Sequence, residues 1–375
     1  MNTYFLTGAS GAVGSAIVPI LLALPDTRVR ILIRATSESH LQERFETLCG
    51  FWKLSSDDPR RLRIEALRGD AAEPQFGLDE SVYETLSRDC THIIHCAATV
   101  RMNESLDDAR HSALGSAQQI LALGRACADA GSLKKIEFVS TVGVAGKRDG
   151  ALPERWIDEP REFHNTYEQS KAEAEALIHD AIEKDGLPLT VHRPSMVIGD
   201  SRDGRIIHFQ IFYFICEFLS GRRTGGLYPD FGETRLDVIP VDCVANAIVD
   251  ASRNGATAGR IFHLCSGPDR APRLHELKTV VREAFARHHA ASTMNLTLPR
   301  SVFAWLPRLA AFLAPPSKRK ALATLPIYLD YLADRQGFDN PYFLAWFQEN
   351  GHQLPQWNAY LPRILEQYLA KDTRR

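Results

Sequence analysis

The chain has 375 residues, of which 45% are hydrophobic and 24% charged, and its formal net charge is −2 at pH 7. This composition is typical of a soluble globular protein with one large domain and an annex, or with two domains. The near-neutral charge excludes a global electrostatic field that would favour nucleic acid or an anionic membrane.

The first predicted elements are a strand over 3–7, a glycine-rich turn and a helix over 13–24. The apolar run from Tyr4 to Leu24 is similar in hydrophobicity to a secretory signal, but it lacks a basic leading region and glycines interrupt it. No run of 18 or more apolar residues follows, so the sequence predicts no membrane span. The seven cysteines form no Cys-x-x-Cys or Cys/His cluster. They therefore indicate neither a metal site nor a disulfide framework, and they favour a cytoplasmic location.

Short β-type runs alternate with helical patterns over the first 265 residues. This alternation predicts an α/β protein with a Rossmann-type, doubly wound parallel sheet. The expected strands are 3–7, 28–33, 63–66, 92–96, 135–139, 189–193 and 261–265, and helices such as 13–24, 113–130 and 167–184 lie between them.

The pattern changes after Pro194, where large apolar side chains crowd the segment 205–219 and residues 270–375 look mostly helical. We therefore predict two units. Residues 1–204, with 236–265 returning to them, form the sheet domain. Residues 205–235 and 266–375 form a smaller, mostly helical substrate-binding lobe.

The segment TGASGAVG places three glycines after the first strand and at the start of a helix. Glycine permits a tight turn and a close approach of the backbone to a pyrophosphate, and the helix N-terminus offers free N–H groups. A glycine triplet alone also marks plain turns, but its place in a strand–turn–helix unit predicts a dinucleotide site. The residues expected to line this site are Gly8, Ser10, Gly11, Ala12, Val13 and Gly14.

The second strand ends in RILIRA, with Arg34 where an NAD enzyme of this design usually carries an acidic residue for the ribose 2′-hydroxyl. A guanidinium suits the 2′-phosphate of NADP. We therefore predict NADP(H) as the cofactor, with Arg44 as a second contact. The alternative for both arginines is a solvated surface position.

Two later strand ends complete the predicted cofactor site. Asp70 follows the third strand and either accepts a hydrogen bond from the adenine amino group or caps a turn. Ala97 and Ala98 follow the fourth strand, and their small side chains let the backbone pass close to the cofactor. The preceding His95 and Cys96 are expected to be packed strand residues.

Tyr167 and Lys171 open the helix after the fifth strand, in the frame NTYEQSK. Residues four apart share a helix face. A phenol has a pKa near 10, and a nearby ammonium lowers it by favouring the phenolate. The pair can then exchange a proton with a carbonyl oxygen that receives hydride, and Lys171 can hold the nicotinamide ribose. One of the hydroxyls that end the fifth strand, Ser140 or Thr141, can stabilise the developing negative charge or simply cap the strand.

The motifs TGASGAVG, ILIRA, RGD, HCAA, VSTVGVAG, YEQSK, HRPSMVIGD and DVIPVD occur in this order over residues 1–265. Together they resemble the extended short-chain dehydrogenases. With Gly146 as the anchor, the resemblance puts Thr141 at the Ser/Thr catalytic position, so that Thr141, Tyr167 and Lys171 form the expected triad. It also implies that Pro194 and Ser195 pass beside the nicotinamide; the alternative is a strand that the proline ends.

Within that superfamily, the chain resembles the thioester reductase and fatty acyl-CoA reductase branch, or male-sterility group. The segments that carry this resemblance are RGDAAEPQFGLDE, IIHCAATV, NTYEQSKAEAE, RPSMVIGDSRDG and LDVIPVDCVANAI. The resemblance implies reduction by NADPH of an acyl thioester, brought by coenzyme A or an acyl carrier protein. The product is an aldehyde, which some members reduce again to an alcohol.

The chain also departs from the family pattern. Ser112 stands in SALGS where the family often has the Asn that orders the active-site backbone and water, which puts the fine proton relay in doubt. Residues 266–375 carry no recognised motif. The sequence shows no adenylation or carrier domain, so the thioester is expected to arrive from elsewhere.

An aromatic segment has three interpretations: lobe core, the wall of an acyl channel, or a surface for a membrane or protein partner. Its aromatic residues are Phe209, Phe212, Tyr213, Phe214 and Phe218. Residues 301–314, followed by three basic residues, could also make a peripheral membrane contact, although Pro307 interrupts that helix. The oligomeric state stays open.

Two other functional classes compete with thioester reduction. One is another oxidoreductase of the same fold: a ketone or alcohol dehydrogenase of the 3β-hydroxysteroid or ketoreductase kind, or a nucleotide-sugar epimerase. Arg34 argues against an epimerase, which should prefer NAD. The other is a non-catalytic NADP-sensing regulator, which needs the glycine turn but not the Tyr167–Lys171 pair.

Overall fold

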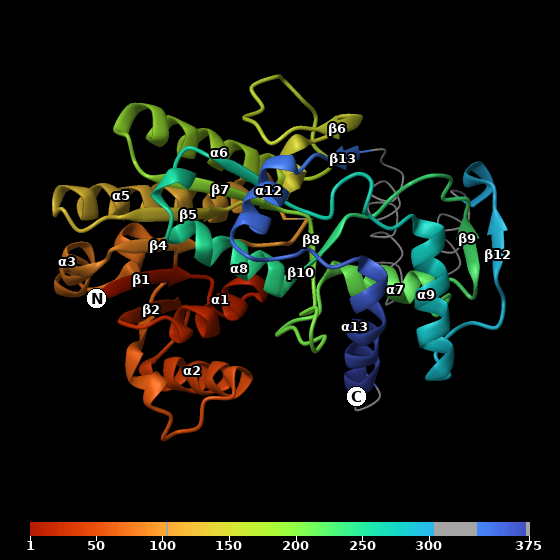
Figure 1. Ribbon diagram of the computed structural model, residues 1–375, viewed down its shortest axis with the longest axis horizontal. Coiled ribbons are helices and arrows are strands. Elements are labelled where there is room, and N and C mark those ends of the chain that lie inside the picture. Colours follow the sequence, from red (N-terminus) through yellow and green to blue (C-terminus); the bar gives the residue numbers. More distant parts are fainter. Residues whose placement is uncertain (103, 304–335, 373–375) are drawn as a thin grey trace.

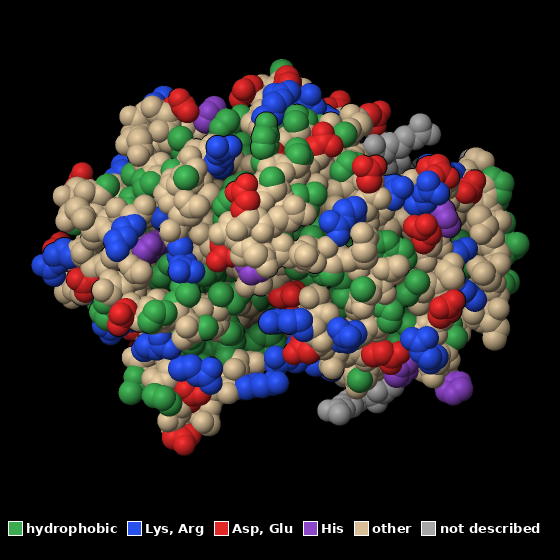
Figure 2. All heavy atoms as spheres, in the orientation of Figure 1, with side chains coloured by type: hydrophobic (Ala, Val, Ile, Leu, Met, Phe, Trp, Pro, Cys, Tyr) green, Lys and Arg blue, Asp and Glu red, His purple; other side chains and the backbone are tan. Residues whose placement is uncertain are grey.

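The computed structural model describes residues 1–102, 104–303 and 336–372 (Figure 1). Figure 1 shows a layered part with a sheet between helices, which holds the N-terminus, and a second part with α7, α9 and α13 beside it. Acidic and basic side chains are interspersed over the face drawn in Figure 2, in keeping with the net charge of −2.

In the described part of the chain, the central sheet has seven parallel strands in the order β11-β7-β5-β4-β1-β2-β3. This confirms the predicted fold class, and the strand ends differ from the expected ones by at most two residues. The strands are β1 (Asn2–Thr7), β2 (Thr27–Ile33), β3 (Ile64–Arg68), β4 (His92–His95), β5 (Lys135–Val139), β7 (Leu189–Pro194) and β11 (Ile261–Leu264).

Helices cover both faces of the sheet, so that its strands are buried on both sides. Successive side chains of a strand point to opposite faces, so Tyr4 and Leu6 belong to one core and Phe5 to the other. The first core is closed by α1 (Ala12–Ala23), α2 (Glu38–Trp52) and α8 (Val241–Ser252). The second is closed by α3 (Glu80–Asp89), α5 (Ser116–Asp129) and α6 (Thr166–Asp185).

The expected helix over 113–130 begins differently from the prediction. A short α4 (Leu106–Arg110) runs into a π-helical turn, His111–Gly115, and only then into α5. Ser112 lies in this turn. Such π-turns occur frequently at functional sites. Here the turn follows β4 and α4 and leads directly into α5.

The lobe has an apolar core of its own. It is built from α7 (Ile211–Leu219), α9 (Leu274–Arg287), α13 (Trp357–Asp372) and the short parallel pair β9 (Leu227–Pro229) and β12 (Leu296–Leu298). The segment expected to be mostly helical therefore also contains strands.

One part of the predicted lobe packs elsewhere. In α12 (Pro341–Glu349), Phe343 and Phe347 are buried in the same core as Tyr4 and Val29 of the sheet. The helix thus covers the sheet domain, although it lies within the predicted lobe range 266–375. The predicted domain limits otherwise stay a prediction.

Two further strand pairs lie beyond the carboxyl ends of the central strands. β6 (Gly150–Leu152) pairs with β13 (Gln336–Phe338), and β8 (Met196–Ile198) pairs with β10 (Val238–Pro240). No helix among the described residues has the length and apolar character needed to cross a membrane. Most of the segment 301–314 lies outside the described residues.

Candidate active site

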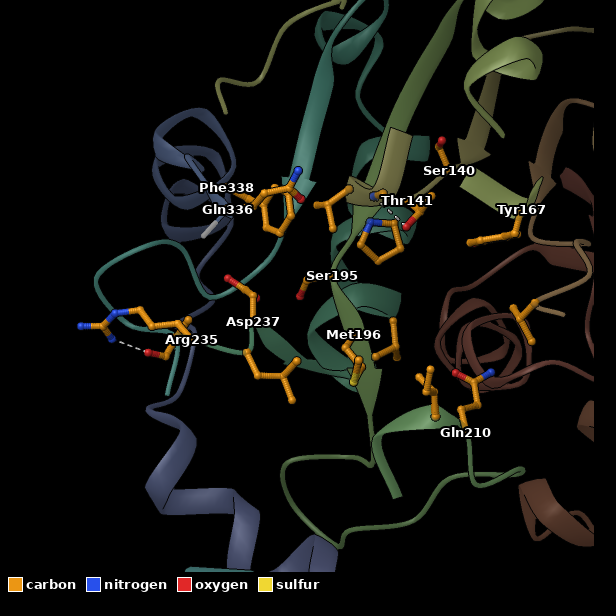
Figure 3. Close-up of a pocket in the computed structure, with 18 of the residues that line it drawn as sticks. Ser140, Thr141, Tyr167, Ser195, Met196, Gln210, Arg235, Asp237, Gln336 and Phe338 are labelled. Carbon is orange, nitrogen blue, oxygen red and sulfur yellow. Dashed lines mark hydrogen bonds between the residues drawn. The ribbon is translucent and has the colours of Figure 1, made fainter. Parts of the chain in front are cut away.

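A cavity of about 1350 Å³ opens at the carboxyl ends of the central strands, where open α/β sheets usually bind ligands. One end is lined by the glycine turn, Gly11–Gly14. The middle is lined by the ends of β5 and β7 and by the start of α6. The far end is lined by the lobe segments 208–211 and 230–237 and by β13. Figure 3 shows the middle and the lobe end.

The glycine turn leaves no room for side chains at two positions. Gly8 has a φ of +77°, and a Cβ there would lie 2.6 Å from the backbone nitrogen of Ala97. A Cβ on Gly14 would lie 2.2 Å from the carbonyl oxygen of Gly8. Among the described residues, no side chain caps the start of α1 at Gly11, and this first turn lines the cavity. A tight turn with uncapped N–H groups fits the pyrophosphate of a dinucleotide.

Arg34 and Arg44 lie together beside this turn rather than in the lining of the cavity. Arg44 donates hydrogen bonds to the carbonyl oxygen of Arg34 and, at 3.4 Å, to Ser10 Oγ. The side chain of Arg34 is 77% exposed and lies 3.8 Å from a carboxylate oxygen of Asp70. An exposed ion pair of this length is weak, so Arg34 is free to turn towards an anion.

The remaining predicted cofactor contacts divide between the cavity and its surroundings. Ala98, Pro194 and Ser195 line the cavity, whereas Ala97 lies behind it against Gly8. Asp70 accepts a hydrogen bond from the backbone N–H of Ala72 at 3.1 Å, as the turn-capping alternative expects.

Thr141, Tyr167 and Lys171 are brought together in the middle of the cavity. Thr141 begins a 3-10 turn, Val142–Ala145, and its Oγ1 accepts a hydrogen bond from Gly143 N at 3.1 Å. Tyr167 is the second residue of α6. Burial raises the pKa of Tyr167 to about 12, against a smaller lowering by its hydrogen bond with Thr141.

Lys171 is buried one turn after Tyr167. Its ammonium donates a hydrogen bond to the carbonyl oxygen of Val139 at 2.9 Å and lies 4.6 Å from the ring centre of Phe138. Burial lowers the pKa of Lys171 to about 8. The sequence argument expected Lys171 to lower the pKa of Tyr167; in the structure, desolvation of the phenol outweighs any such effect and the pKa rises. The phenol therefore stays protonated at pH 7.

Ser140 and Thr141 both line the cavity, but they differ in their contacts. Ser140 is buried and its Oγ has no hydrogen-bond partner within the described residues. In Figure 3 its side chain points away from Tyr167, whereas Thr141 lies between Tyr167 and Ser195. The geometry therefore favours Thr141, as the motif alignment predicted.

Two polar residues that sequence reasoning missed hold Tyr167 in the first turn of α6. Asn165 caps the helix by accepting a hydrogen bond from Glu168 N at 2.9 Å. Glu168 in turn accepts one from His164 N at 3.0 Å. The sequence N-x-x-E is the usual signal for such a helix start and could have identified both residues.

Three further polar residues near the strand ends are structural or lie outside the cavity. His95 is buried between Thr7 Oγ1 at 2.8 Å and Ser116 Oγ at 3.3 Å, and burial lowers its pKa to about 3. Asp242 accepts two hydrogen bonds from Ser201 and so anchors a loop. Ser112 does not line the cavity.

The residues of the aromatic segment differ in their surroundings, so no single one of the three interpretations covers them all. Phe212, Tyr213 and Phe218 are buried in the lobe core. Phe209 lines the cavity. Phe214 is 52% exposed, with the guanidinium of Arg223 4.8 Å from its ring centre. The sequence could not separate these residues, since they fall within one short apolar run.

Several lining residues at the lobe end were not anticipated: Gln210, Arg235, Arg300 and Gln336. Asp237 anchors a loop by accepting hydrogen bonds from Ser266 N at 2.8 Å and Gly267 N at 2.9 Å, and it also lines the cavity. Burial raises the pKa of Asp237 to about 6.

Known proteins resemble this chain along most of its length. The sequence profile of the family described as "Male sterility protein" matches residues 6–248. Isonitrile lipopeptide synthase of Streptomyces coeruleorubidus is 32% identical over 249 residues, which are 66% of this chain and only 16% of that relative. The chain thus corresponds to a small part of this much larger protein.

Solved structures extend the likeness to the whole chain. The terminal R domain of the myxalamid PKS-NRPS biosynthetic pathway has a TM-score of 0.81 and 26% identity, covering 100% of this chain and 91% of that one. A thiolation-reductase di-domain of an archaeal non-ribosomal peptide synthetase shares the fold, with a TM-score of 0.77 and 17% identity over 100% of this chain and 76% of the di-domain.

Proposed function

The chain belongs to the male sterility protein family, a branch of the extended short-chain dehydrogenases and reductases that bind a nicotinamide cofactor, and we propose that it reduces acyl thioesters with NADPH. The membership confirms the resemblance predicted from the motifs. The proposed activity rests above all on one observation: Thr141, Tyr167 and Lys171 meet in a cavity that is continuous with the glycine turn.

The protonation states of Tyr167 and Lys171 suit the reduction of a thioester carbonyl. When bound, NADPH supplies the hydride that adds to the thioester carbonyl carbon. Thr141 and Tyr167 hold the carbonyl oxygen, and the neutral phenol of Tyr167 gives it a proton as negative charge develops. The resulting hemithioacetal loses the thiol and leaves an aldehyde. Lys171, charged below about pH 8, holds the ribose next to Tyr167.

The preference for NADPH over NADH is supported by Arg34 and Arg44, which lie beside the glycine turn at the end of β2. The residues proposed to contact the cofactor are those of the turn (Gly8, Ser10, Gly11, Ala12, Val13 and Gly14), with Arg34, Arg44, Asp70, Ala97, Ala98, Tyr167, Lys171, Pro194 and Ser195. We also propose a cytoplasmic location, in keeping with seven free cysteines.

An acyl carrier protein is the proposed source of the thioester. The reductase of the archaeal di-domain is joined to a thiolation domain, which supports such a carrier here. Coenzyme A is the alternative carrier, because both present the acyl group on the same phosphopantetheine arm.

The test is to incubate purified protein with NADPH and each of four substrate classes: acyl carrier thioesters, acyl-CoAs, aldehydes and ketones. We expect NADPH oxidation with the thioesters and release of one thiol per aldehyde. Further oxidation with aldehydes would extend the product to the alcohol. Turnover of ketones without turnover of any thioester would instead support the ketoreductase alternative.

A further inference from the structure

The lobe end of the cavity carries two arginine side chains, Arg235 and Arg300. Arg300 lies over the turn 230–234: it donates to the carbonyl oxygens of Asp230 at 2.7 Å and Phe231 at 2.8 Å and to Thr234 Oγ1 at 3.2 Å. Arg235 follows this turn and donates to the carbonyl oxygen of Ala271. Figure 3 shows Arg235 on the opposite side of the cavity from Tyr167.

Three carboxylates, those of Asp230, Glu233 and Asp237, line the same end of the cavity. Among the residues that the structure describes, no Asp or Glu oxygen pairs with Arg235 or Arg300, whereas the neighbouring Arg273 lies 3.3 Å from Glu233. The carboxylate of Asp230 accepts from Gly232 N at 3.0 Å, and that of Asp237 is bound by two backbone N–H groups.

Several donors of these arginines remain available. A guanidinium has five N–H donors. Arg300 binds the described residues through Nε and Nη2, and Arg235 through Nη1 alone. Arg235 keeps Nε and Nη2, the edge through which arginine binds a phosphate by two parallel hydrogen bonds, and Arg300 keeps the two N–H donors of Nη1. The site is therefore suited to a phosphate group.

The cofactor does not account for this pair, because its phosphates are expected at the glycine turn, which lines the other end of the cavity, and at Arg34 beside that turn. We propose that Arg235 and Arg300 bind the 4′-phosphate of a phosphopantetheinyl thioester. The proposal rests on the proposed thioester reduction. In such a substrate the phosphate and the sulfur stand at opposite ends of the arm, as Arg235 and Tyr167 stand at opposite sides of the cavity.

Binding can be measured without turnover. Protein saturated with NADP⁺ is titrated calorimetrically with pantetheine, 4′-phosphopantetheine and coenzyme A, so that the cofactor site is already filled. We expect both phosphorylated thiols to bind about tenfold or more tightly than pantetheine, with a difference that shrinks as salt rises. Equal binding of pantetheine and 4′-phosphopantetheine would overturn the proposal. Tighter binding of coenzyme A than of 4′-phosphopantetheine would show that the nucleotide adds contacts beyond the shared phosphate.

The arginines are tested by the double variant Arg235→Gln/Arg300→Gln, which should reduce the preference to within about twofold. Arg287→Gln is the matched control, because Arg287 lies on α9 outside the cavity and pairs with Glu366 at 3.0 Å. It should leave the preference unchanged. Since Arg300 also holds the turn 230–234, thermal unfolding is measured in parallel. Arg235→Gln, which removes one hydrogen bond to the backbone, serves alone if the double variant unfolds.

Kinetics separate this proposal from the proposed function. For one acyl group, the phosphopantetheine thioester should show a lower KM than the pantetheine thioester and a similar kcat, and the double variant should equalise the two KM values. If both thioesters are reduced equally well by the unmodified protein, the reductase function stands and the phosphate site falls. If phosphopantetheine binding depends on the arginines but no thioester is reduced, the phosphate site stands and the reductase function falls.

Discussion

The ammonium of Lys171 donates a hydrogen bond of 2.9 Å to the carbonyl oxygen of Val139, the last residue of β5. This contact joins the first turns of α6 to the strand end from which Ser140 and Thr141 follow. The contact thus fixes the position of Tyr167, the proposed proton donor on α6, relative to Thr141, the proposed oxyanion-binding residue after β5.

Removal of the proposed proton donor should abolish turnover. Tyr167→Phe keeps the ring and its packing but loses the hydroxyl, and such donors typically contribute about 10²–10⁴-fold to the rate. We expect at least about a hundredfold loss of kcat, measured by NADPH oxidation, with NADPH affinity nearly unchanged in a fluorescence titration. A variant that keeps more than about a tenth of the rate would show that another group supplies the proton.

The rate should fall on the alkaline side because burial lowers the pKa of Lys171 to about 8. The lysine is charged below this pH and loses its proton as the pH rises through it, so kcat/KM for NADPH, which reports the free enzyme, should decline by about tenfold per pH unit above about 8. Lys171→Arg keeps the charge and should give a low but flat profile. If kcat/KM of this variant still falls above about pH 8, the fall must come from the deprotonation of another group.

Arg34→Ala should remove most of the preference for NADPH over NADH. A hydrogen bond to a charged group contributes about 1.5–3 kcal/mol, which corresponds to about ten- to a hundredfold in affinity. Arg44→Ala should reduce the preference less, because Arg44 contacts the backbone of Arg34 and the hydroxyl of Ser10. Arg28→Ala is the control, since Arg28 lies near the other end of β2 and pairs with Glu65. Equal affinity of the unmodified protein for both cofactors would contradict the assignment.

The wall of the proposed acyl channel is tested at Phe209. The rate constant kcat/KM should rise by about fourfold per added CH₂, at about 0.8 kcal/mol each, until the channel is full. Phe209→Ala enlarges the cavity and should move the optimum to longer chains. Phe214→Ala should leave it in place, because Phe214 faces outward. A flat response to chain length would remove the channel argument.

The glycine turn can be tested against a matched glycine elsewhere. Gly8 and Gly131 have similar φ values, +77° and +72°, but only Gly8 has backbone atoms in the place of a Cβ. Both alanine variants carry the strain of the left-handed region, about 1–2 kcal/mol. Gly8→Ala should lose about 1–3 kcal/mol more in the free energy of unfolding and should also lose cofactor affinity. If urea unfolding shows equal losses of free energy for the two variants, the backbone near Gly8 must shift to make room for the added Cβ.

The sequence predicted those parts of the fold that depend on local patterns. The seven strands of the central sheet were found within two residues because each is a short buried run bounded by turn residues, and Tyr167 and Lys171 were found because they share one helix face. The order of motifs also selected Thr141 over Ser140. These features need no knowledge of distant contacts.

Features created by tertiary contacts could not be predicted. Gln336 of β13 binds the carbonyl oxygen of Gly146, 190 positions away, and a three-residue strand has too short a pattern to recognise. The raised pKa of Tyr167 depends on burial, which no residue spacing reveals. Likewise, Phe209 and Phe212 look alike in the sequence, but only Phe209 lines the cavity.

The position of α12 on the sheet has a consequence for how the chain folds during synthesis. β1 is made first and stands between β4 and β2 in the sheet, yet the core on one of its faces is completed by α8 and by Phe343 and Phe347, which emerge more than two hundred residues later. Contacts between segments so far apart in the sequence form slowly. Until α12 arrives, the nascent sheet presents the apolar surface that Phe343 and Phe347 cover in the finished fold, and such exposed surface makes a folding intermediate prone to aggregation.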